Sequence, residues 1–215
     1  MRKKDVILLY GAGGLGVEVL DLLHRSGRWS NRMPLFIDDF SPTGSTLDIK
    51  KVSYEYALDK YFGSDLIVTV GDPHAREQIL SRAKDGGFSL PTIVDSNARV
   101  SKHCEVGEGS VICAGSTIAA RSKVSSNVLI NVSSIVGHDV KIGRSSVLAS
   151  MVNTGGFCEI GTEVMLGMSV TLRPGVKIGD NTVVALGSTV FSDIPSNVIV
   201  TGSPARVSRK ILDKE

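Results

Sequence analysis

The stretch INVSSIVGHDVKIG, residues 130–143, decides the fold because its aliphatic residues recur at every sixth position. Ile130, Val136 and Ile142 mark this period. An α-helix cannot place every sixth residue on one side, whereas a coil of three flat faces with six residues per face can. The stretch therefore predicts part of a regular solenoid wall, in which the ionisable pair His138 and Asp139 is held at fixed positions.

The same period extends in both directions, from Val94 to Val190. Sixteen of these seventeen positions are aliphatic, with Thr154 as the exception, and the next residue is often glycine or another small residue. This pattern is typical of a parallel β-helix built from hexapeptide repeats. Eighteen residues make one coil, so we expect residues eighteen apart to stack at about 4.8 Å. The segment after Val190 leaves the period and is predicted to cap the open end.

The first half of the chain alternates between strand and helix patterns. The apolar runs DVILLYG, PLFIDDF, DLIVTVG and LPTIV are interpreted as strands. The segment after GAGGLG, YEYALDKYF and DPHAREQILSRAKDGG are interpreted as helices. This order predicts a small Rossmann-like βαβαβαβ domain over residues 1–92, followed by a β-helix domain over residues 93–215.

Composition and charge exclude several classes of protein. The net charge of the 215-residue chain is +2, from 24 basic and 22 acidic residues, which does not favour nucleic acid or an anionic membrane as partner. The first residues resemble a signal peptide, but Glu18 and Asp21 fall at helical spacing. No apolar stretch is long enough to span a bilayer. The three cysteines lack metal-like spacing, and a cytoplasmic location is expected.

Six motifs in order give the chain a family resemblance: LLYGAGGLGVEVLDLL, FIDDF, VTVGDPHAREQIL, DSNARVSKHCEVGEGSVI, SSIVGHDVKIG and GSPARV. Together they resemble the sugar acetyltransferases that join a Rossmann-like domain to a left-handed β-helix. That group includes the UDP-4-amino-sugar acetyltransferase of bacillosamine synthesis and the sialic acid O-acetyltransferases. The resemblance implies acetyl-CoA as co-substrate, and a homotrimer with active sites between adjacent β-helices.

His138, Asp139 and Gly156 are the predicted catalytic residues. Acetyl transfer to an amine or hydroxyl needs a group that removes the acceptor proton, and histidine suits this near neutral pH. The resemblance implies that His138 is this base, and a carboxylate at Asp139 would orient the ring. Gly156 lies eighteen residues after His138, so it should stack beside the ring and offer its N–H to an oxyanion. Alternatively, Gly155 and Gly156 simply form a corner.

For acetyl-CoA, the resemblance implies contacts with Met168, Leu186 and Gly187, and with the backbone of Gly156. The same residues could also be ordinary wall positions. Relatives often carry a second histidine nine residues after the first, where this chain has Val147.

The segment GAGGLG matches the dinucleotide pattern GxGxxG, which alone is a weak signal. In the resembling family, this glycine turn and an aspartate pair hold a nucleotide sugar. The implied substrate residues are Gly13, Gly14, Leu15, Asp38, Asp39 and Gly71. The relatives often have histidine or an aromatic residue at the position of Leu15. Alternatively, Asp38 and Asp39 form a solvated strand end.

These observations predict an acetyl-CoA-dependent enzyme that acetylates the amino group of a nucleotide-linked sugar. One alternative is O-acetylation of sialic acid or a related sugar. Others are a non-catalytic trimeric scaffold that binds nucleotide or CoA, and a Rossmann oxidoreductase. The other histidines, His24, His74 and His103, look structural or exposed. Only His103 and His138 lie on coils, so we expect no zinc site of the carbonic anhydrase type.

Overall fold

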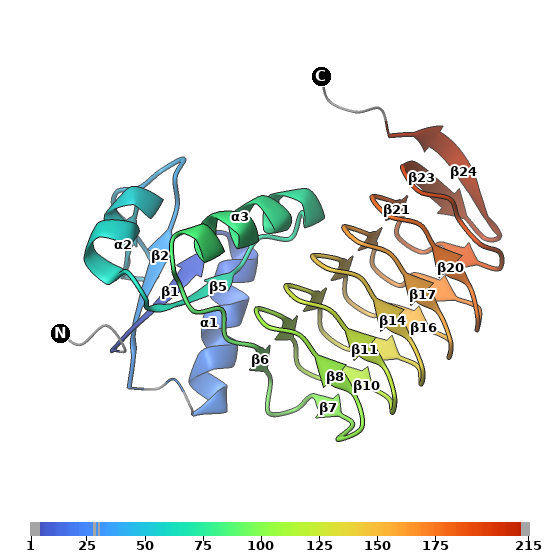
Figure 1. Ribbon diagram of the computed structural model, residues 1–215, viewed down its shortest axis with the longest axis horizontal. Helices are drawn as coiled ribbons and strands as arrows, with labels where there is room; N and C mark the ends of the chain where they lie inside the picture. Colours follow the sequence, from blue (N-terminus) through green and yellow to red (C-terminus); the bar gives the residue numbers. More distant parts are fainter. Residues whose placement is uncertain (1–4, 28, 30, 212–215) are drawn as a thin grey trace.

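A computed structural model describes residues 5–27, 29 and 31–211 of the chain. An α/β domain comes first and a β-helix follows it (Figure 1). The elements of the α/β domain are β1 (Val6–Tyr10), α1 (Gly14–Ser26), β2 (Met33–Ile37), β3 (Ser45–Thr46), β4 (Ile49–Val52), α2 (Tyr54–Tyr61), β5 (Asp65–Val68) and α3 (Pro73–Asp85). Their sheet has the order β3-β4-β2-β1-β5, with only β3 and β4 antiparallel.

Local sequence explains where the helices begin and end. Asp72 accepts the N–H of Ala75 and Pro73 occupies the first position of α3, so both cap signals in the sequence are used. Helix α1 begins at Gly14 with no side-chain cap and ends at Gly27, whose φ of 65° is left-handed. The uncapped N–H groups of α1 therefore remain directed at the carboxyl end of β1, where a ligand anion can accept from them.

The run LPTIV is the one predicted strand that joins a different sheet. We predicted it as the fourth strand of the α/β domain, but β6 (Ile93–Val94) pairs with β9 in the β-helix. Only a single bridge, from Asp65 to Ser89, extends the α/β sheet past β5. A short apolar run does not indicate which strand it will pair with. Here the six-residue period that starts at Val94 places the run in the β-helix. The hairpin β3–β4 was not predicted.

The β-helix is a three-sided prism of two-residue strands (Figure 1). The first sheet contains β7 (Arg99–Val100), β10 (Thr117–Ile118), β13 (Ile135–Val136), β16 (Asn153–Thr154), β19 (Thr171–Leu172) and β22 (Thr189–Val190). The second contains β8 (Glu105–Val106), β11 (Lys123–Val124), β14 (Lys141–Ile142), β17 (Glu159–Ile160) and β20 (Lys177–Ile178). The third contains β6, β9 (Val111–Ile112), β12 (Leu129–Ile130), β15 (Val147–Leu148), β18 (Met165–Leu166), β21 (Val183–Val184), β23 (Val198–Gly202) and β24 (Ala205–Lys210).

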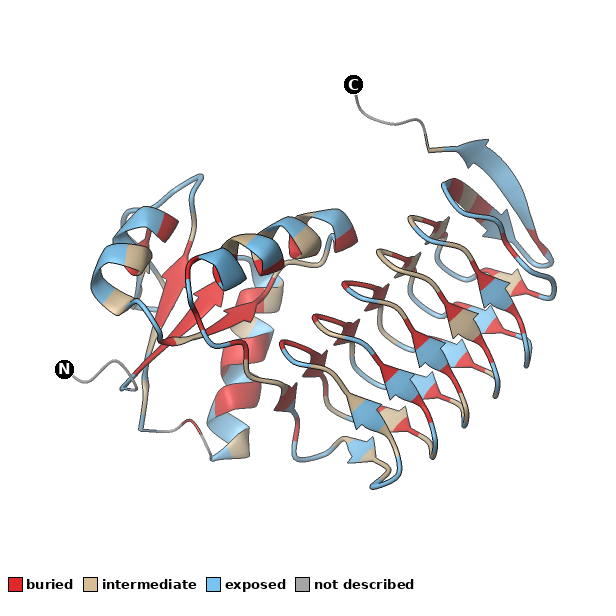
Figure 2. Cartoon of the chain, in the orientation of Figure 1, coloured by how far each residue is buried: buried red, intermediate tan, exposed pale blue. Residues whose placement is uncertain are grey.

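Pairing in the β-helix follows the predicted eighteen-residue register. Val136 pairs with Ile118 on one side and Thr154 on the other. From Ile112 onward, the aliphatic residues of the period point into the prism and form one continuous buried core, and Val100 and Val106 pack against it partly buried. Val94, the first residue of the period, is instead 38% exposed. Figure 2 shows the buried residues as red segments in successive coils. Thr154 is also buried, at 2% exposed, and its hydroxyl accepts the N–H of Gly137. The polar exception to the period is therefore satisfied inside the core.

The corners of the prism have a period of their own. Every sixth residue from 109 to 187 has a φ between 51° and 78°, and only four of these fourteen residues are glycines: Gly109, Gly115, Arg121, Asn127, Ser133, Asp139, Ser145, Met151, Phe157, Glu163, Ser169, Gly175, Asn181 and Gly187. A left-handed residue at each corner lets the chain turn sharply between two flat strands. Asp139 is one of these corner residues, so its backbone is fixed by the fold and does not belong to a free loop.

Strands β23 and β24 form an antiparallel hairpin that ends the third sheet. The predicted cap is thus present up to Ile211, and its last four residues lie outside the described part of the chain. None of the described helices is long and apolar enough to cross a membrane.

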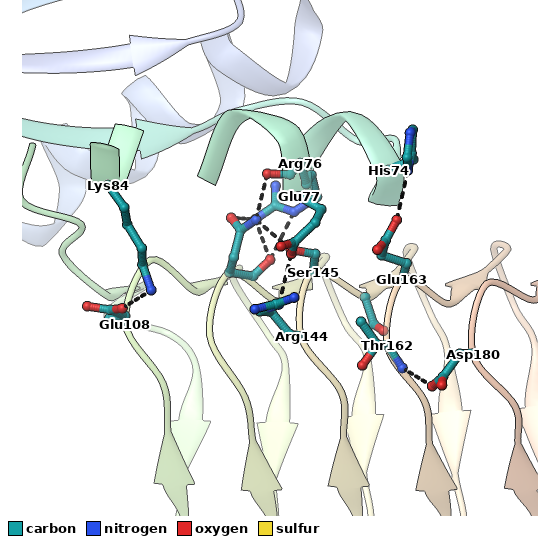
Figure 3. A network of polar contacts seen from close by, with 12 residues as sticks. His74, Arg76, Glu77, Lys84, Glu108, Arg144, Ser145, Thr162, Glu163 and Asp180 are labelled. Atoms are coloured by element: carbon teal, nitrogen blue, oxygen red, sulfur yellow. Dashed lines mark hydrogen bonds and ion pairs between the residues drawn. The ribbon is translucent and has the colours of Figure 1, made fainter. Parts of the chain in front are cut away.

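The α/β domain packs on one side of the prism. Ile7 and Leu9 of β1 and the apolar face of α1 share a buried cluster with Leu129, Val147 and other outward residues of the third sheet. Helix α3 lies along the corner between the second and third sheets, where its eleven residues from His74 to Lys84 span about 15 Å. That length matches about three coil spacings, so α3 extends over four coils (Figure 3).

Polar contacts from α3 to four successive coils fix this position (Figure 3). The pairs are Lys84–Glu108, Arg76–Asn127, Glu77–Ser145 and His74–Glu163. Arg76 is fully buried and donates to the backbone carbonyls of Val68, Val70 and Asn127. The α/β domain is therefore held on the prism by a buried arginine flanked by exposed ion pairs.

Candidate active site

His138 and Asp139 lie at the corner between the first and second sheets, in the turn that joins β13 to β14. The inward residues Val136 and Ile142 anchor both sides of this turn and are at most 1% exposed. The Asp139 N–H donates to the carbonyl of Ala120 in the preceding coil, and the Phe157 N–H in the following coil donates to the carbonyl of His138. Both ends of the dyad are thus tied to the neighbouring coils.

The carboxylate of Asp139 reaches the imidazole despite the short side chain. Its Oδ2 lies 2.7 Å from Nδ1 of His138. Arg121 also binds Asp139 in a two-pronged contact, with Nε and Nη2 each 2.7 Å from a carboxylate oxygen. Hydrogen bonds from the Arg121 guanidinium, the larger effect, and from the His138 ring lower the pKa of Asp139 to about 2. Because an ionised carboxylate can only accept, Nδ1 carries the proton and Nε2 of the neutral ring has a free lone pair.

Gly156 lies against the imidazole, as the eighteen-residue period predicts. A Cβ at this position would come within 2.7 Å of Cε1 and 2.8 Å of Nε2 of His138, so the ring occupies the space that a larger residue would need. Within the described residues, the N–H of Gly156 donates to no acceptor. It is therefore free to bind a ligand oxygen next to Nε2. The carbonyl of Gly156 accepts the N–H of Gly175, so the residue is also part of the regular wall.

Arg121 and Phe157 were not predicted from the sequence, although the coil spacing places both beside the dyad. Arg121 comes eighteen residues before Asp139 and Phe157 eighteen residues after it. The Phe157 ring packs edge-on against His138 with centroids 5.0 Å apart, and it is 59% exposed. The imidazole thus contacts both a carboxylate and an aromatic ring, and the His138 side chain remains 55% exposed.

Met168, Leu186 and Gly187 lie at a different corner, between the third and first sheets. Met168 and Leu186 are 51% and 70% exposed, and the N–H of Gly187 donates to the carbonyl of Met168 in the coil below. They form an exposed apolar strip that the first sheet separates from His138. Val147 lies elsewhere again, 3% exposed beneath the α/β domain. The structure therefore groups Met168 with Leu186, but does not bring either next to His138 of the same chain.

A cavity of about 470 Å³ opens at the carboxyl ends of β1, β2 and β5. Gly13, Asp38 and Asp39 are among its lining residues, together with Phe40 and Arg82. Of the other predicted substrate residues, Gly14 begins α1, Leu15 packs against the core beneath that helix, and Gly71 follows the lining residue Val70. The cavity thus combines the free N-terminus of a helix with an arginine, a pairing suited to phosphate groups.

The two aspartates of the cavity differ in their environments. Asp39 accepts from the Tyr10 hydroxyl at 2.5 Å, from Arg82 at 2.7 Å and from the Tyr54 N–H at 2.8 Å. Burial alone would raise the pKa of Asp39, but these donors hold it below its usual value.

The other aspartate is less constrained. Asp38 accepts the N–H groups of Phe40 and Ser41 through Oδ1 and lies 3.7 Å from Nζ of Lys51. Asp39 therefore organises the cavity wall, and Asp38 has more capacity to bind a ligand.

The remaining histidines are exposed. His74 contacts Glu163 at 2.9 Å, while His24 and His103 are exposed. In the part of the chain that the structure describes, no group of three or more His, Cys, Asp or Glu side chains could hold a metal ion.

Comparisons with known proteins agree with this architecture. Residues 6–83 match the family model described as the PglD N-terminal domain. A stretch of 35 residues is 51% identical to the Saccharomyces cerevisiae protein YJL218W, and this match spans 18% of that protein's length.

Solved structures match along nearly the whole chain. The acetyltransferase domain of PglB from Neisseria gonorrhoeae FA1090 is 27% identical, with a TM-score of 0.89 over 95% of this chain and 100% of that one. A mutant perosamine N-acetyltransferase from Caulobacter crescentus, in complex with CoA and GDP-perosamine, is 29% identical, with a TM-score of 0.88 over 95% and 97%. WeeI from Acinetobacter baumannii AYE is 26% identical, with a TM-score of 0.88 over 94% and 99%.

The fold that these proteins share is a Rossmann-like α/β domain followed by a left-handed β-helix. Both domains and their order agree with it. Residues 6–83 thus form a PglD-type N-terminal domain, and over about 95% of its length the chain is similar in structure to acetyltransferases that include a perosamine N-acetyltransferase.

Proposed function

We propose that this protein transfers an acetyl group from acetyl-CoA to the amino group of a nucleotide-linked sugar, with a UDP-linked 4-amino sugar as the first candidate. The observation that carries this proposal is the corner of the β-helix where Nδ1 of His138 is held by Asp139. Nε2 is left free beside the unused N–H of Gly156. This is a base and an oxyanion donor in adjacent coils, as acyl transfer to an amine requires.

In the proposed reaction, Nε2 of His138 removes a proton as the neutral amine attacks the thioester carbonyl. A carbon–nitrogen bond forms, and the carbonyl oxygen becomes an oxyanion that accepts the N–H of Gly156. Collapse of the tetrahedral intermediate breaks the carbon–sulfur bond, and the imidazolium returns its proton to the leaving CoA sulfur. Asp139 keeps the ring in the required tautomer and stabilises its protonated form.

The α/β cavity is proposed to hold the nucleotide sugar. Its free α1 N-terminus at Gly13 and Gly14 and the guanidinium of Arg82 suit a diphosphate, and Asp38 suits a sugar or ribose hydroxyl. The Caulobacter structure with CoA and GDP-perosamine supports a nucleotide amino sugar as the class of acceptor. Leu15 packs in the core, so its proposed contribution is to shape the glycine turn.

We also propose a homotrimer in which each site is shared between neighbouring chains. The α/β domain covers the third sheet, whereas His138 lies at the opposite corner of the prism. The acetyl-CoA strip at Met168, Leu186 and Gly187 occupies yet another corner. No single chain brings these three parts together within its described residues, and a second copy packed against the first sheet would do so.

The proposed domain boundary falls between residues 92 and 93, just before β6. The proposed location is the cytoplasm, where acetyl-CoA is available and where the three free cysteines, Cys104, Cys113 and Cys158, would stay reduced. The product would serve surface-glycan or glycoprotein synthesis.

The function is tested by measuring CoA thiol release from acetyl-CoA with a panel of acceptors. The panel contains UDP- and GDP-linked 4-amino sugars, the same sugars with a hydroxyl in place of the amine, and sialic acids. We expect turnover with an amino sugar and a loss of at least about 10²-fold in kcat for His138→Asn, which cannot act as the base.

Turnover only with hydroxyl acceptors would instead establish O-acetylation. Lack of turnover with every acceptor, together with acetyl-CoA or nucleotide binding by calorimetry, would favour a non-catalytic scaffold. Near wild-type turnover of His138→Asn would overturn the mechanism.

A further inference from the structure

Arg121 is an exposed arginine whose contacts are concentrated on one partner. Its side chain is 66% exposed, yet Nε and Nη2 bind the two oxygens of Asp139 at 2.7 Å each. Both residues are left-handed corner residues, with φ of 61° and 59°, and they stack in successive coils. The fork of a guanidinium matches a carboxylate in this geometry and restricts its rotation.

The contact has a direct consequence for the imidazole. Oδ2 of Asp139 is shared between Nη2 of Arg121 and Nδ1 of His138. A short aspartate directly next to the histidine in sequence could point away from the ring, and Arg121 removes that freedom. The guanidinium also offsets part of the negative charge that the ring senses.

We propose that Arg121 is a positioning residue that acts through Asp139 in two ways: it aims the carboxylate at Nδ1 and it limits how strongly the carboxylate stabilises the protonated ring. This proposal rests on the proposed role of His138 as base. The low pKa of Asp139, about 2, supports it, because Asp139 then stays ionised throughout the working pH range.

Arg121 and Asp139 line a small cavity on the second sheet together with three other charged residues. They are Lys123, Lys141 and Glu159. Lys123 pairs with Glu105 at 3.2 Å and Lys141 pairs with Glu159 at 3.1 Å. Each cation is thus partnered away from Asp139, which leaves Arg121 as the cation in contact with the dyad among the described residues. Lys123 therefore offers a control of equal charge in the same coil as Arg121.

The sign of the expected pH effect follows from these charges. Without Arg121, the full charge of Asp139 acts on the ring, and the ring keeps its proton to a higher pH. The base must be neutral to act, so the acid limb of kcat/KM moves upward, by about 0.5 to 1 pH unit at this exposed site. A half-unit shift is about a threefold loss of activity on the acid side, added to a fall in kcat from misorientation.

The test compares Arg121→Met, Arg121→Lys and Lys123→Met in the full-length protein. We expect Arg121→Met to move the acid limb upward and to lower kcat about tenfold, with KM for both substrates within twofold of wild type. Arg121→Lys should keep the acid limb near its wild-type position, because the charge remains, but lose part of kcat because the fork is lost. Lys123→Met should leave both unchanged.

A second measurement does not depend on catalysis. NMR of histidine-labelled protein follows the pH at which the His138 ring signals shift, with His138→Asn used for assignment. This pH should rise in Arg121→Met and not in Lys123→Met, even if the acceptor has been wrongly chosen.

An unmoved ring titration together with an unmoved acid limb in Arg121→Met overturns the proposal. A change confined to KM for the sugar would also overturn it, because Arg121 would then contact the substrate. Failure of the proposed function has a different signature, namely full activity in His138→Asn.

Discussion

The His138 side chain is 55% exposed, so its orientation depends on a few specific neighbours. Asp139 holds Nδ1, the Phe157 ring contacts one edge, and Gly156 leaves the space that the ring fills. All of these neighbours are either adjacent in sequence or one coil away. The rigid spacing of the coils therefore provides the precise geometry that acyl transfer needs at a solvent-exposed corner.

Gly156 offers a sharp test of this packing. In Gly156→Ala the new methyl group would lie 2.7 Å from Cε1 of His138, so the ring must move. The ring is exposed and can rotate away, so we expect a change of less than about 1 kcal/mol in the free energy of unfolding. Displacement of the base should nevertheless lower kcat by about 10²-fold. Urea unfolding and steady-state kinetics measure the two effects.

A double-mutant cycle supplies the control for Gly156. In a His138→Ala background the ring is gone, and the Gly156→Ala change should cost less stability than it does beside the ring. Equal costs in both backgrounds would show that the glycine is needed for the corner itself and not for the histidine.

At the scale of elements, helix α3 serves both domains. Ala75, Gln78, Ile79 and Arg82 line the cavity, while Arg76 and Glu77 contact the coils. Arg76 also donates to the carbonyls of Val68 and Val70, and Val70 is itself a lining residue. One helix thus fixes the cavity of the α/β domain relative to the β-helix.

Replacing Arg76 with Met should be much more damaging than removing an exposed ion pair of the same helix. The methionine leaves three carbonyl groups, two of them buried, without the arginine donor, and we expect a loss of about 3 kcal/mol or more in the free energy of unfolding. Lys84→Met, which removes the exposed pair with Glu108, should cost less than about 1 kcal/mol. Urea unfolding followed by fluorescence of Trp29, the only tryptophan, measures both. Similar losses in the two variants would contradict this role of Arg76.

For the whole molecule, the main feature is the separation of the proposed site into parts. The cavity of the α/β domain, proposed to hold the nucleotide sugar, lies on the side of the third sheet, and His138 lies at the corner opposite that sheet. Ile135, on the outer face of the first sheet between the two candidate corners, is 45% exposed. A trimer that covers this face would join the cavity of one chain to the histidine of another.

Mixing two inactive variants tests this sharing. His138→Asn lacks the base. Gly13→Glu places a carboxylate at the cavity, where a Cβ meets no atom within 4 Å, and should repel a diphosphate. In randomly mixed trimers, a shared site needs an intact cavity from one variant next to an intact histidine from the other. Activity should therefore recover to about one quarter of wild type.

The controls for this experiment are the two variants assayed alone and a mixture kept below the concentration for trimer assembly. Light scattering reports the oligomer. Recovery that stays at the level of the separate variants, in confirmed mixed trimers, would place the whole site within a single chain.

The sequence predicted local secondary structure well, but it predicted less well which strands pair with one another. Patterns within a few residues predicted the capped helix α3, the strand β1 and the buried period from Ile112 to Val190. The partner of LPTIV was predicted wrongly, because an apolar strand pairs equally well with several sheets. The stacking of Gly156 on His138 was predictable because the coil repeat converts a sequence interval into a distance.

By itself, the sequence determined the solenoid, its eighteen-residue register and the position of His138 on a rigid wall. The repeat alone determines which residues stack in neighbouring coils, so this part of the structure needs no contact with distant parts of the chain. Only the tertiary structure decided which side of the prism the α/β domain covers. It also decided that Asp39 is engaged by Tyr10 and Arg82, and that Arg121 binds Asp139. The Asp39 contacts and the docking of the α/β domain join distant parts of the chain, and no single stretch of sequence encodes which buried faces and charges will meet.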